Sequence, residues 1–250
     1  KQLLLQLNNT PLTLVWTAHP TETQGVSHIH HLQSIIDYCH TYQQDLDPLS
    51  LQKIRQGILA KLTLIWQSED VPHHSIDVLD EVRRSLYYFE SRLAPVIPTF
   101  LNDIRRCICQ QYGVKQTDVK LPSFIRFHMW PGGDRDGHPF VTAETTHQTL
   151  YLQHDCLLRV YLAALTPLQT SLSISVNHSQ ISSALKRSIQ KDQRLFKHRV
   201  QSLESINPTE CYRQKCMFIR LKCDAMRYHY HQHARQAGFQ DARTNHQLNT

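Results

Sequence analysis

The chain reads LTLVWTAHP from Leu12 to Pro20 and SFIRFHMWPGG from Ser123 to Gly133. In the first stretch apolar side chains alternate with β-branched ones. In the second, Arg126 and His128 alternate with apolar residues. A period of two predicts a β-strand, and proline and glycine end it. We therefore expect strands over about 12–17 and 123–130, each followed by a loop of polar and ionisable residues.

Most of the remaining sequence has the spacing of amphipathic helices. Apolar stripes predict helices over about 26–39, 51–65, 79–93, 100–108, 142–165, 179–203 and 208–234, with 111–122 as a loop. Asp47-Pro48 suits the start of the second helix, Thr142 can cap the fifth, and Pro95 is expected to stop the third. The predicted fold class is mostly α with a few parallel strands, in a single region over 1–250.

The long helical connection between the two strands allows them to pair in parallel and excludes a hairpin. Residues just beyond the carboxyl ends of parallel strands gather on one face of a β/α barrel or an open α/β sheet, where such folds place their active sites. Parallel pairing would therefore bring the segment after the first strand, with His19, toward the loop after the second, with Arg135.

Composition narrows the class of protein. The chain has 250 residues, of which 40% are hydrophobic and 19% charged, which is typical of a soluble globular protein and excludes a disordered one. A net charge of +6 suggests an anionic partner. The basic residues are scattered, however, with doublets such as Arg83-Arg84 as the longest runs, so we expect no nucleic-acid partner. The apolar stretches are too short to span a bilayer, and no membrane partner is expected.

The seven cysteines form an odd count without paired spacing. This pattern favours reduced thiols in a cytoplasmic protein. The chain opens on Lys1 rather than methionine, so we expect a processed product or a piece of something longer.

The first candidate site is the segment Thr17–Glu22, with the sequence TAHPTE. A histidine at a strand end, fixed by the following Pro20, is well placed as a general acid or base, because histidine titrates near physiological pH. Thr21 and Glu22 can orient the His19 ring or open the next helix. The alternative is that His19 only fills a strand–helix turn.

The second candidate site is the loop GGDRDGHP at residues 132–139. Glycines let a backbone approach a ligand and present amide donors to an anion. The planar fork of Arg135 suits carboxylate or phosphate. Asp134 and Asp136 can bind metal or hold the arginine. The alternative is a self-contained turn in which the two aspartates only neutralise Arg135.

The 17 histidines suggest a metal site. His229 and His233 are four residues apart, which suits two ligands on one helix face. The sequence shows no evident third ligand, and a polar, glutamine-rich chain favours surface histidines. No metal ligands are therefore predicted in this segment.

The two motifs together resemble those of phosphoenolpyruvate carboxylase of the bacterial and plant type. LVWTAHPTE at 14–22 resembles the active-site histidine signature of that family, and WPGGDRDGHPFVT at 130–142 resembles its glycine-rich loop. Shorter blocks at 66–70, 80–89 and 207–220 follow in the family order. The resemblance is collinear from about Leu12 to Leu221.

This resemblance implies a β/α (TIM-like) barrel elaborated with helices, of which the chain holds a part. It implies carboxylation of phosphoenolpyruvate with bicarbonate, giving oxaloacetate and phosphate, with Mg²⁺ or Mn²⁺ held by ligands outside this segment. It also implies a homotetramer for the full-length protein. His19 is then the catalytic histidine. The substrate pocket is expected to use Gly132, Gly133, Asp134, Arg135, Asp136 and Gly137, with Thr17, Pro20, Thr21 and Glu22 in support.

The chain also departs from the family pattern. Two basic residues usually follow the histidine signature, where this chain has Gly25 and Val26, and a second arginine-bearing stretch is replaced by Pro72 and His73. Family members are several times longer. Two hypotheses follow: part of a working carboxylase that is inactive alone, or a non-catalytic remnant that acts as a helical interaction module.

Overall fold

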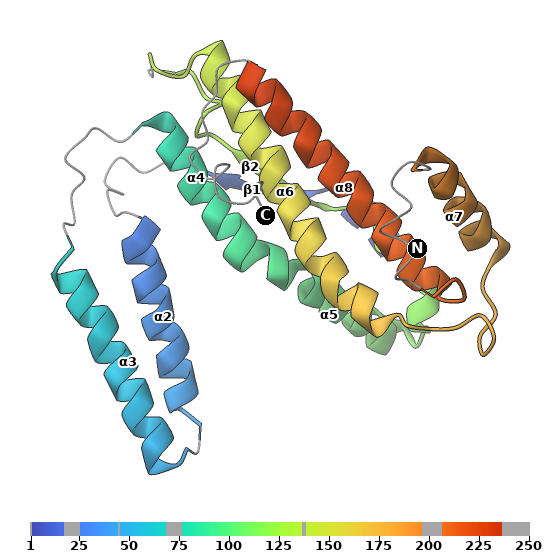
Figure 1. Ribbon diagram of the computed structural model, residues 1–250, viewed down its shortest axis with the longest axis horizontal. Helices are drawn as coiled ribbons and strands as arrows, with labels where there is room; N and C mark the ends of the chain where they lie inside the picture. The colour runs from blue at the N-terminus through green and yellow to red at the C-terminus, as the bar shows by residue number, and fades with distance from the viewer. Residues whose placement is uncertain are drawn as a thin grey trace. The chain divides into compact units, whose positions relative to one another are not determined.

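The computed structural model describes residues 2–17, 26–44, 46–68, 77–136, 139–196 and 207–236 (Figure 1). These residues are mostly helical and include two strands, as the sequence predicts. In chain order the elements are α1 (Gln2–Asn9), β1 (Leu12–Trp16), α2 (Val26–Tyr42), α3 (Pro48–Trp66), α4 (Val78–Tyr88), the π-helix η1 (Phe89–Leu93), α5 (Ala94–Tyr112), the 3₁₀-helix η2 (Gln116–Asp118), β2 (Ile125–Met129), α6 (Ala143–Ser171), α7 (Ser183–Leu195) and α8 (Cys211–Gln236).

The strands β1 and β2 pair in parallel, which confirms the pairing expected from their long connection. The register runs from Leu12 opposite Ile125 to Trp16 opposite Met129. The Trp130 amide donates to the Trp16 carbonyl at 2.8 Å and closes the ladder at its carboxyl end. Two strands do not close a barrel, so the β/α barrel stays a prediction.

The chain divides into two compact units. The first contains Lys1–Ser85 and Pro122–Val141, and the second contains Leu86–Leu121 and Thr142–Thr250. The sheet and the pair of helices α2 and α3 therefore belong to the first unit. That residues 1–250 act as a single region stays a prediction.

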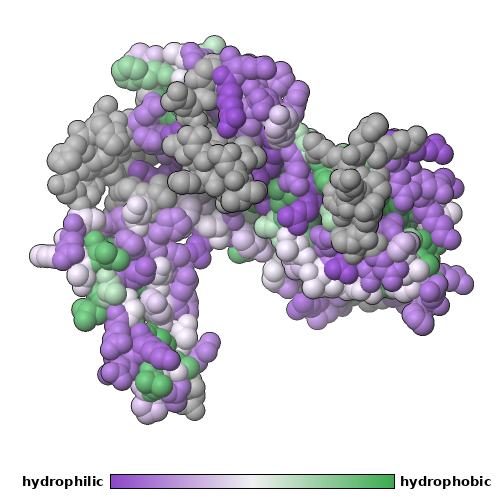
Figure 2. Space-filling model, viewed as in Figure 1, coloured by the Kyte–Doolittle hydropathy of each residue, from purple (hydrophilic) through white to green (hydrophobic). Residues whose placement is uncertain are grey.

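The helices α2 and α3 pack against each other in the first unit (Figure 1). As predicted, α3 begins after Asp47, whose carboxylate accepts from the backbone amides of Leu49 and Ser50. A Cβ at Gly57 would lie 2.5 Å from the Tyr38 ring, so a larger residue at this position would displace the Tyr38 side chain. Figure 2 shows hydrophobic side chains on the surface of this pair. Trp66, the last residue of α3, is 90% exposed.

The helical path from α4 to α5 is continuous. The prediction that Pro95 stops the helix is therefore wrong. The Ala94 amide donates to the Phe89 carbonyl, which is the wide turn of the π-helix η1. Pro95 follows this wide turn directly, and the wider turn lets the helical path continue past a residue that has no backbone N–H. The helix ends at Tyr112, and its cap, Gly113, has a φ of 62°.

The core of the second unit lies between α6 and α8, which run side by side (Figure 1). Its buried cluster consists of Leu158, Leu165, Cys216 and Cys223. Thr142 caps α6 as predicted, because its hydroxyl accepts from the Thr145 amide at 3.2 Å. Helix α7 packs on α8 and begins four residues later than predicted, after the cap Ser182.

None of the described helices is long and apolar enough to cross a bilayer.

Candidate functional site

The loop after β2 leaves the sheet at the same edge as the segment after β1. Met129 and Trp16 are register partners, and the next residues are Trp130 and Thr17. Thr17 is exposed, whereas Pro131 and Gly132 are buried. The two predicted motifs therefore begin at one edge of the sheet, as parallel pairing requires.

The loop opens with a tight turn that its sequence explains. The amides of Gly133 and Asp134 both donate to the Trp130 carbonyl at 2.9 Å. Pro131 occupies the first central position, and Gly132 the second with a φ of 74°. A type II turn favours proline and then glycine at these positions, because only glycine adopts a positive φ without strain. The turn directs the next residues away from the ladder.

The charged part of the loop is exposed to solvent. Asp134, Arg135 and Asp136 are all exposed, and the Asp136 amide donates to the Asp134 carboxylate at 3.1 Å. Within the described part of the loop no ion pair joins Arg135 to either aspartate. The geometry is that of a short polar turn with an exposed guanidinium, which can contact a carboxylate or phosphate.

Several predicted site residues lie outside the described residues. These are His19, Pro20, Thr21, Glu22 and Gly137. Gly25, Pro72 and His73, where the sequence departs from the family pattern, also lie outside the described residues. Val26 is the first residue of α2. The roles assigned to all the predicted site residues stay predictions.

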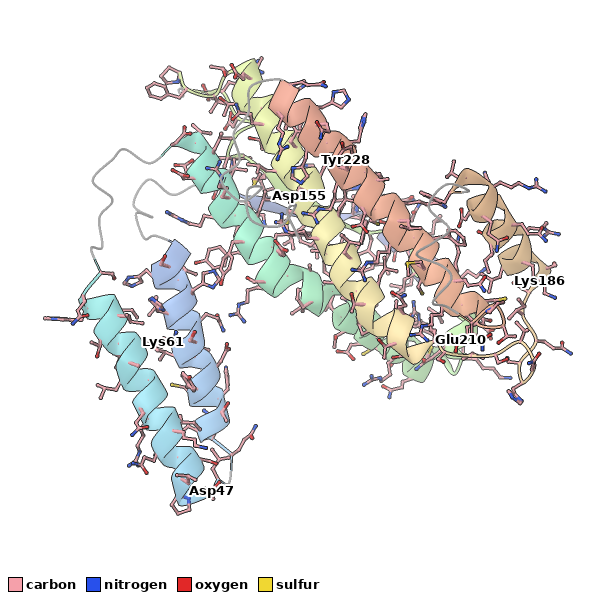
Figure 3. All side chains as sticks on the ribbon, in the orientation of Figure 1. Asp47, Lys61, Asp155, Lys186, Glu210 and Tyr228 are labelled. Carbon is pink, nitrogen blue, oxygen red and sulfur yellow. The ribbon has the colours of Figure 1, made fainter. Side chains whose placement is uncertain are left out.

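The sequence did not reveal a charged cluster in the second unit, centred on Asp155 of α6 (Figure 3). The Asp155 carboxylate accepts from Arg227 Nε at 2.7 Å, lies 3.1 Å from His231 Nε2 and pairs with Arg159. Arg159 also donates to the Glu90 carboxylate of η1, with its Nη2 atom 2.7 Å away. These contacts join η1, α6 and α8. The spacing of Asp155 and Arg159 is the only local signal, because the other partners are far away in the sequence.

The surroundings of Asp155 and Cys156 shift the pKa values of both side chains. Burial raises the pKa of Asp155, but hydrogen bonds from His231 and Arg227 and the charge of Arg159 outweigh it and lower that pKa to about 2. Burial, followed by the negative charge of Glu90, raises the pKa of the Cys156 thiol to about 12. Cys156 is therefore an unreactive core thiol, and the cluster is a structural ion-pair network.

A second buried carboxylate, Asp192, joins α7 to α8. Lys215 Nζ lies 2.6 Å from one of its oxygens, and Lys222 pairs with the other. Burial raises the pKa of Asp192, but the two lysines outweigh it, and the net shift is downward. Two cations on one carboxylate fix the position of α7 along α8.

The histidines do not form a metal centre in the part of the chain that the structure describes. The rings of His229 and His233 have centroids 4.3 Å apart on α8. Within residues 2–17, 26–44, 46–68, 77–136, 139–196 and 207–236 no group of three or more His, Cys, Asp and Glu side chains can hold a metal ion. These residues do not fit a divalent-metal site.

Comparison with known proteins gives one consistent family. The sequence model of the family described as phosphoenolpyruvate carboxylase matches residues 1–249. The phosphoenolpyruvate carboxylase of Roseiflexus castenholzii is 30% identical over 208 residues, which are 83% of this chain and 22% of that protein. That of a strain of Prochlorococcus marinus is 32% identical over 228 residues, or 88% of this chain and 22% of that protein.

The similarity covers most of this chain but a small part of each relative. The phosphoenolpyruvate carboxylase of Parasynechococcus marenigrum is 30% identical over 89% of this chain, and again 22% of that protein is covered. The chain thus spans about a fifth of the length of the curated relatives it matches. The family match extends over both motifs, both strands and the helices between them, and the chain belongs to the phosphoenolpyruvate carboxylase family.

Proposed function

We propose that the chain takes part in the carboxylation of phosphoenolpyruvate by bicarbonate, which gives oxaloacetate and inorganic phosphate. One observation carries this proposal: β1 and β2 pair in parallel, so the two motifs that follow them begin at the same edge of the sheet. Parallel α/β folds form their active sites at that edge. Family membership supports the same reaction, because the relatives are named for it.

In this proposal His19 is the catalytic histidine. The reaction passes through carboxyphosphate and an enolate, and His19 assists transfer of the carboxyl group to the enolate carbon. Histidine suits this step because its ordinary pKa lets it hold or release a proton near neutral pH. Thr17, Pro20, Thr21 and Glu22 support the ring and fix its direction.

The loop after β2 forms the anion pocket in this proposal. The exposed guanidinium of Arg135 can bind a carboxylate or phosphate through two parallel hydrogen bonds. Backbone amides of a glycine-rich turn add donors for the same anion. The complete set proposed for the pocket is Gly132, Gly133, Asp134, Arg135, Asp136 and Gly137.

Because the chain spans 22% of its relatives, we propose that these 250 residues are inactive alone. The rest of a full-length carboxylase would complete a β/α barrel and supply the ligands of Mg²⁺ or Mn²⁺. We further propose that the full-length protein is a cytoplasmic homotetramer.

The test is oxaloacetate formation by the full-length protein, followed through coupled reduction of oxaloacetate to malate. We expect the wild type to be active and His19→Asn to lose nearly all turnover, because asparagine cannot exchange a proton. His178→Asn, at an exposed position of the loop after α6, is the matched control and should keep full activity. A His19→Asn protein as active as the control would refute the role of His19.

The departures at Gly25 and Val26 favour one alternative, a non-catalytic carboxylase-like remnant that acts as a helical interaction module. The same assay decides between the two functions. A full-length wild type that is folded and forms no oxaloacetate would support the remnant and refute the carboxylase.

A further inference from the structure

The two faces of the sheet differ in chemistry. In the parallel register Thr13 lies beside Arg126, and Val15 lies beside His128. Side chains alternate along a strand, so these four residues share one face, and all four are exposed. The other face is apolar and consists of Leu12, Leu14, Trp16, Ile125, Phe127 and Met129.

The face with Thr13, Val15, Arg126 and His128, here called the basic face, carries no acidic side chain. Its two basic residues are two positions apart on β2, so their Cα atoms are about 7 Å apart along the strand. That spacing lets one anion with two charged groups contact both side chains. His128 also precedes the Trp130–Gly133 turn by two residues, so the basic face adjoins the loop that holds Arg135.

Parallel α/β folds form their substrate sites at the carboxyl ends of the strands, and the basic face reaches that end of β2 at His128, one residue before Met129. From this arrangement we propose that Arg126 and His128 bind the phosphate and carboxylate groups of phosphoenolpyruvate. This inference rests on the proposed function and adds two binding residues that neither motif contains. Arg126 contributes the bidentate fork, and His128 a ring N–H donor.

Direct binding is the decisive measurement, because it does not depend on turnover. Calorimetric titration of the full-length protein with phosphoenolpyruvate, without bicarbonate, should give a dissociation constant about tenfold weaker for Arg126→Gln, the usual effect of losing a hydrogen bond to a charged group. His128→Leu should weaken binding in the same direction, because leucine cannot donate. Arg126→Lys, which keeps the charge and loses the fork, should lie between wild type and Arg126→Gln.

The matched control is Arg187→Gln, an exposed arginine on α7 that should leave the affinity unchanged. Thermal unfolding of each variant should match the wild type, because Arg126 and His128 are exposed. In turnover assays Arg126→Gln should raise KM for phosphoenolpyruvate and leave kcat nearly unchanged.

The outcomes separate this inference from the proposed function. Equal affinities for wild type, Arg126→Gln and the control would overturn the basic face as a binding surface, even if the enzyme is active. If the wild type binds phosphoenolpyruvate but forms no oxaloacetate, and Arg126→Gln alone weakens that binding, the carboxylase function is refuted and the binding surface is retained. No binding of phosphoenolpyruvate by the wild type would overturn both.

Discussion

At the scale of single residues, Asp155 is a largely buried charge with three side-chain partners. Its side chain is 12% exposed, and its carboxylate contacts Arg159, Arg227 and His231. Asp155→Asn would leave two partly buried arginines without their shared counter-charge. We expect a loss of about 2 kcal/mol in the free energy of unfolding, below the range for fully buried pairs because the arginines are partly exposed. Urea unfolding of the full-length wild type and of Asp155→Asn at neutral pH measures this loss.

The matched control is Asp103→Asn, which removes an exposed pair with Arg106 at 3.5 Å and should cost less than about 0.5 kcal/mol. The effect of Asp155→Asn should also depend on pH. The folded pKa of Asp155, about 2, is below its ordinary value of 3.8, so its stabilisation is complete above pH 4 and is lost as the pH falls toward 2. A difference between wild type and Asp155→Asn that stays constant from pH 6 to pH 3 would contradict this account.

At the scale of elements, the cap of α6 is a local feature that the sequence predicts and the structure confirms. The Thr142 hydroxyl satisfies the Thr145 amide at the start of a 29-residue helix. Thr142→Ala removes this acceptor and should lower the free energy of unfolding by about 1 kcal/mol, whereas Thr142→Ser keeps the hydroxyl and should be close to wild type. Urea unfolding compares the two, and equal losses would show that the hydroxyl is not the cause.

Local sequence predicted the features that depend on local chemistry. The alternation in LTLVW and the Pro131-Gly132 turn are fixed by backbone preferences within a few residues. The parallel pairing also followed, because the long connection excludes a hairpin. The prediction that Pro95 stops the helix was wrong, because the wide turn of η1 directly before it accommodates a proline within a continuous helical path.

The Asp155 cluster could not be predicted for a different reason. Arg227 and His231 meet Asp155 only because α8 packs along α6, and no spacing in the sequence specifies that contact. The same limit applies to Lys215 and Lys222 at Asp192. In the candidate site, by contrast, both motifs were found from sequence because each follows directly from a strand end.

At the scale of the whole molecule, we propose that the segment after β1 and the loop after β2 serve one substrate site. Both begin at the same edge of the parallel sheet in the first unit. A substrate bound there should shield both at once, whichever residues perform the chemistry. The substrate to use is the one in the proposed function, phosphoenolpyruvate.

The most direct measurement is the rate of alkylation of a thiol introduced on each side, by Thr17→Cys or by Gly133→Cys, in the full-length protein. Both positions are exposed, and a Cβ at Gly133 meets its nearest atoms at an ordinary 3.7 Å. Peptide mapping by mass spectrometry separates the introduced thiols from the seven native cysteines. Asp118→Cys on η2, also exposed, is the control. We predict that saturating phosphoenolpyruvate slows alkylation at both sites and not at the control. Protection of only one site, or of neither, would contradict the claim that the two motifs form one site.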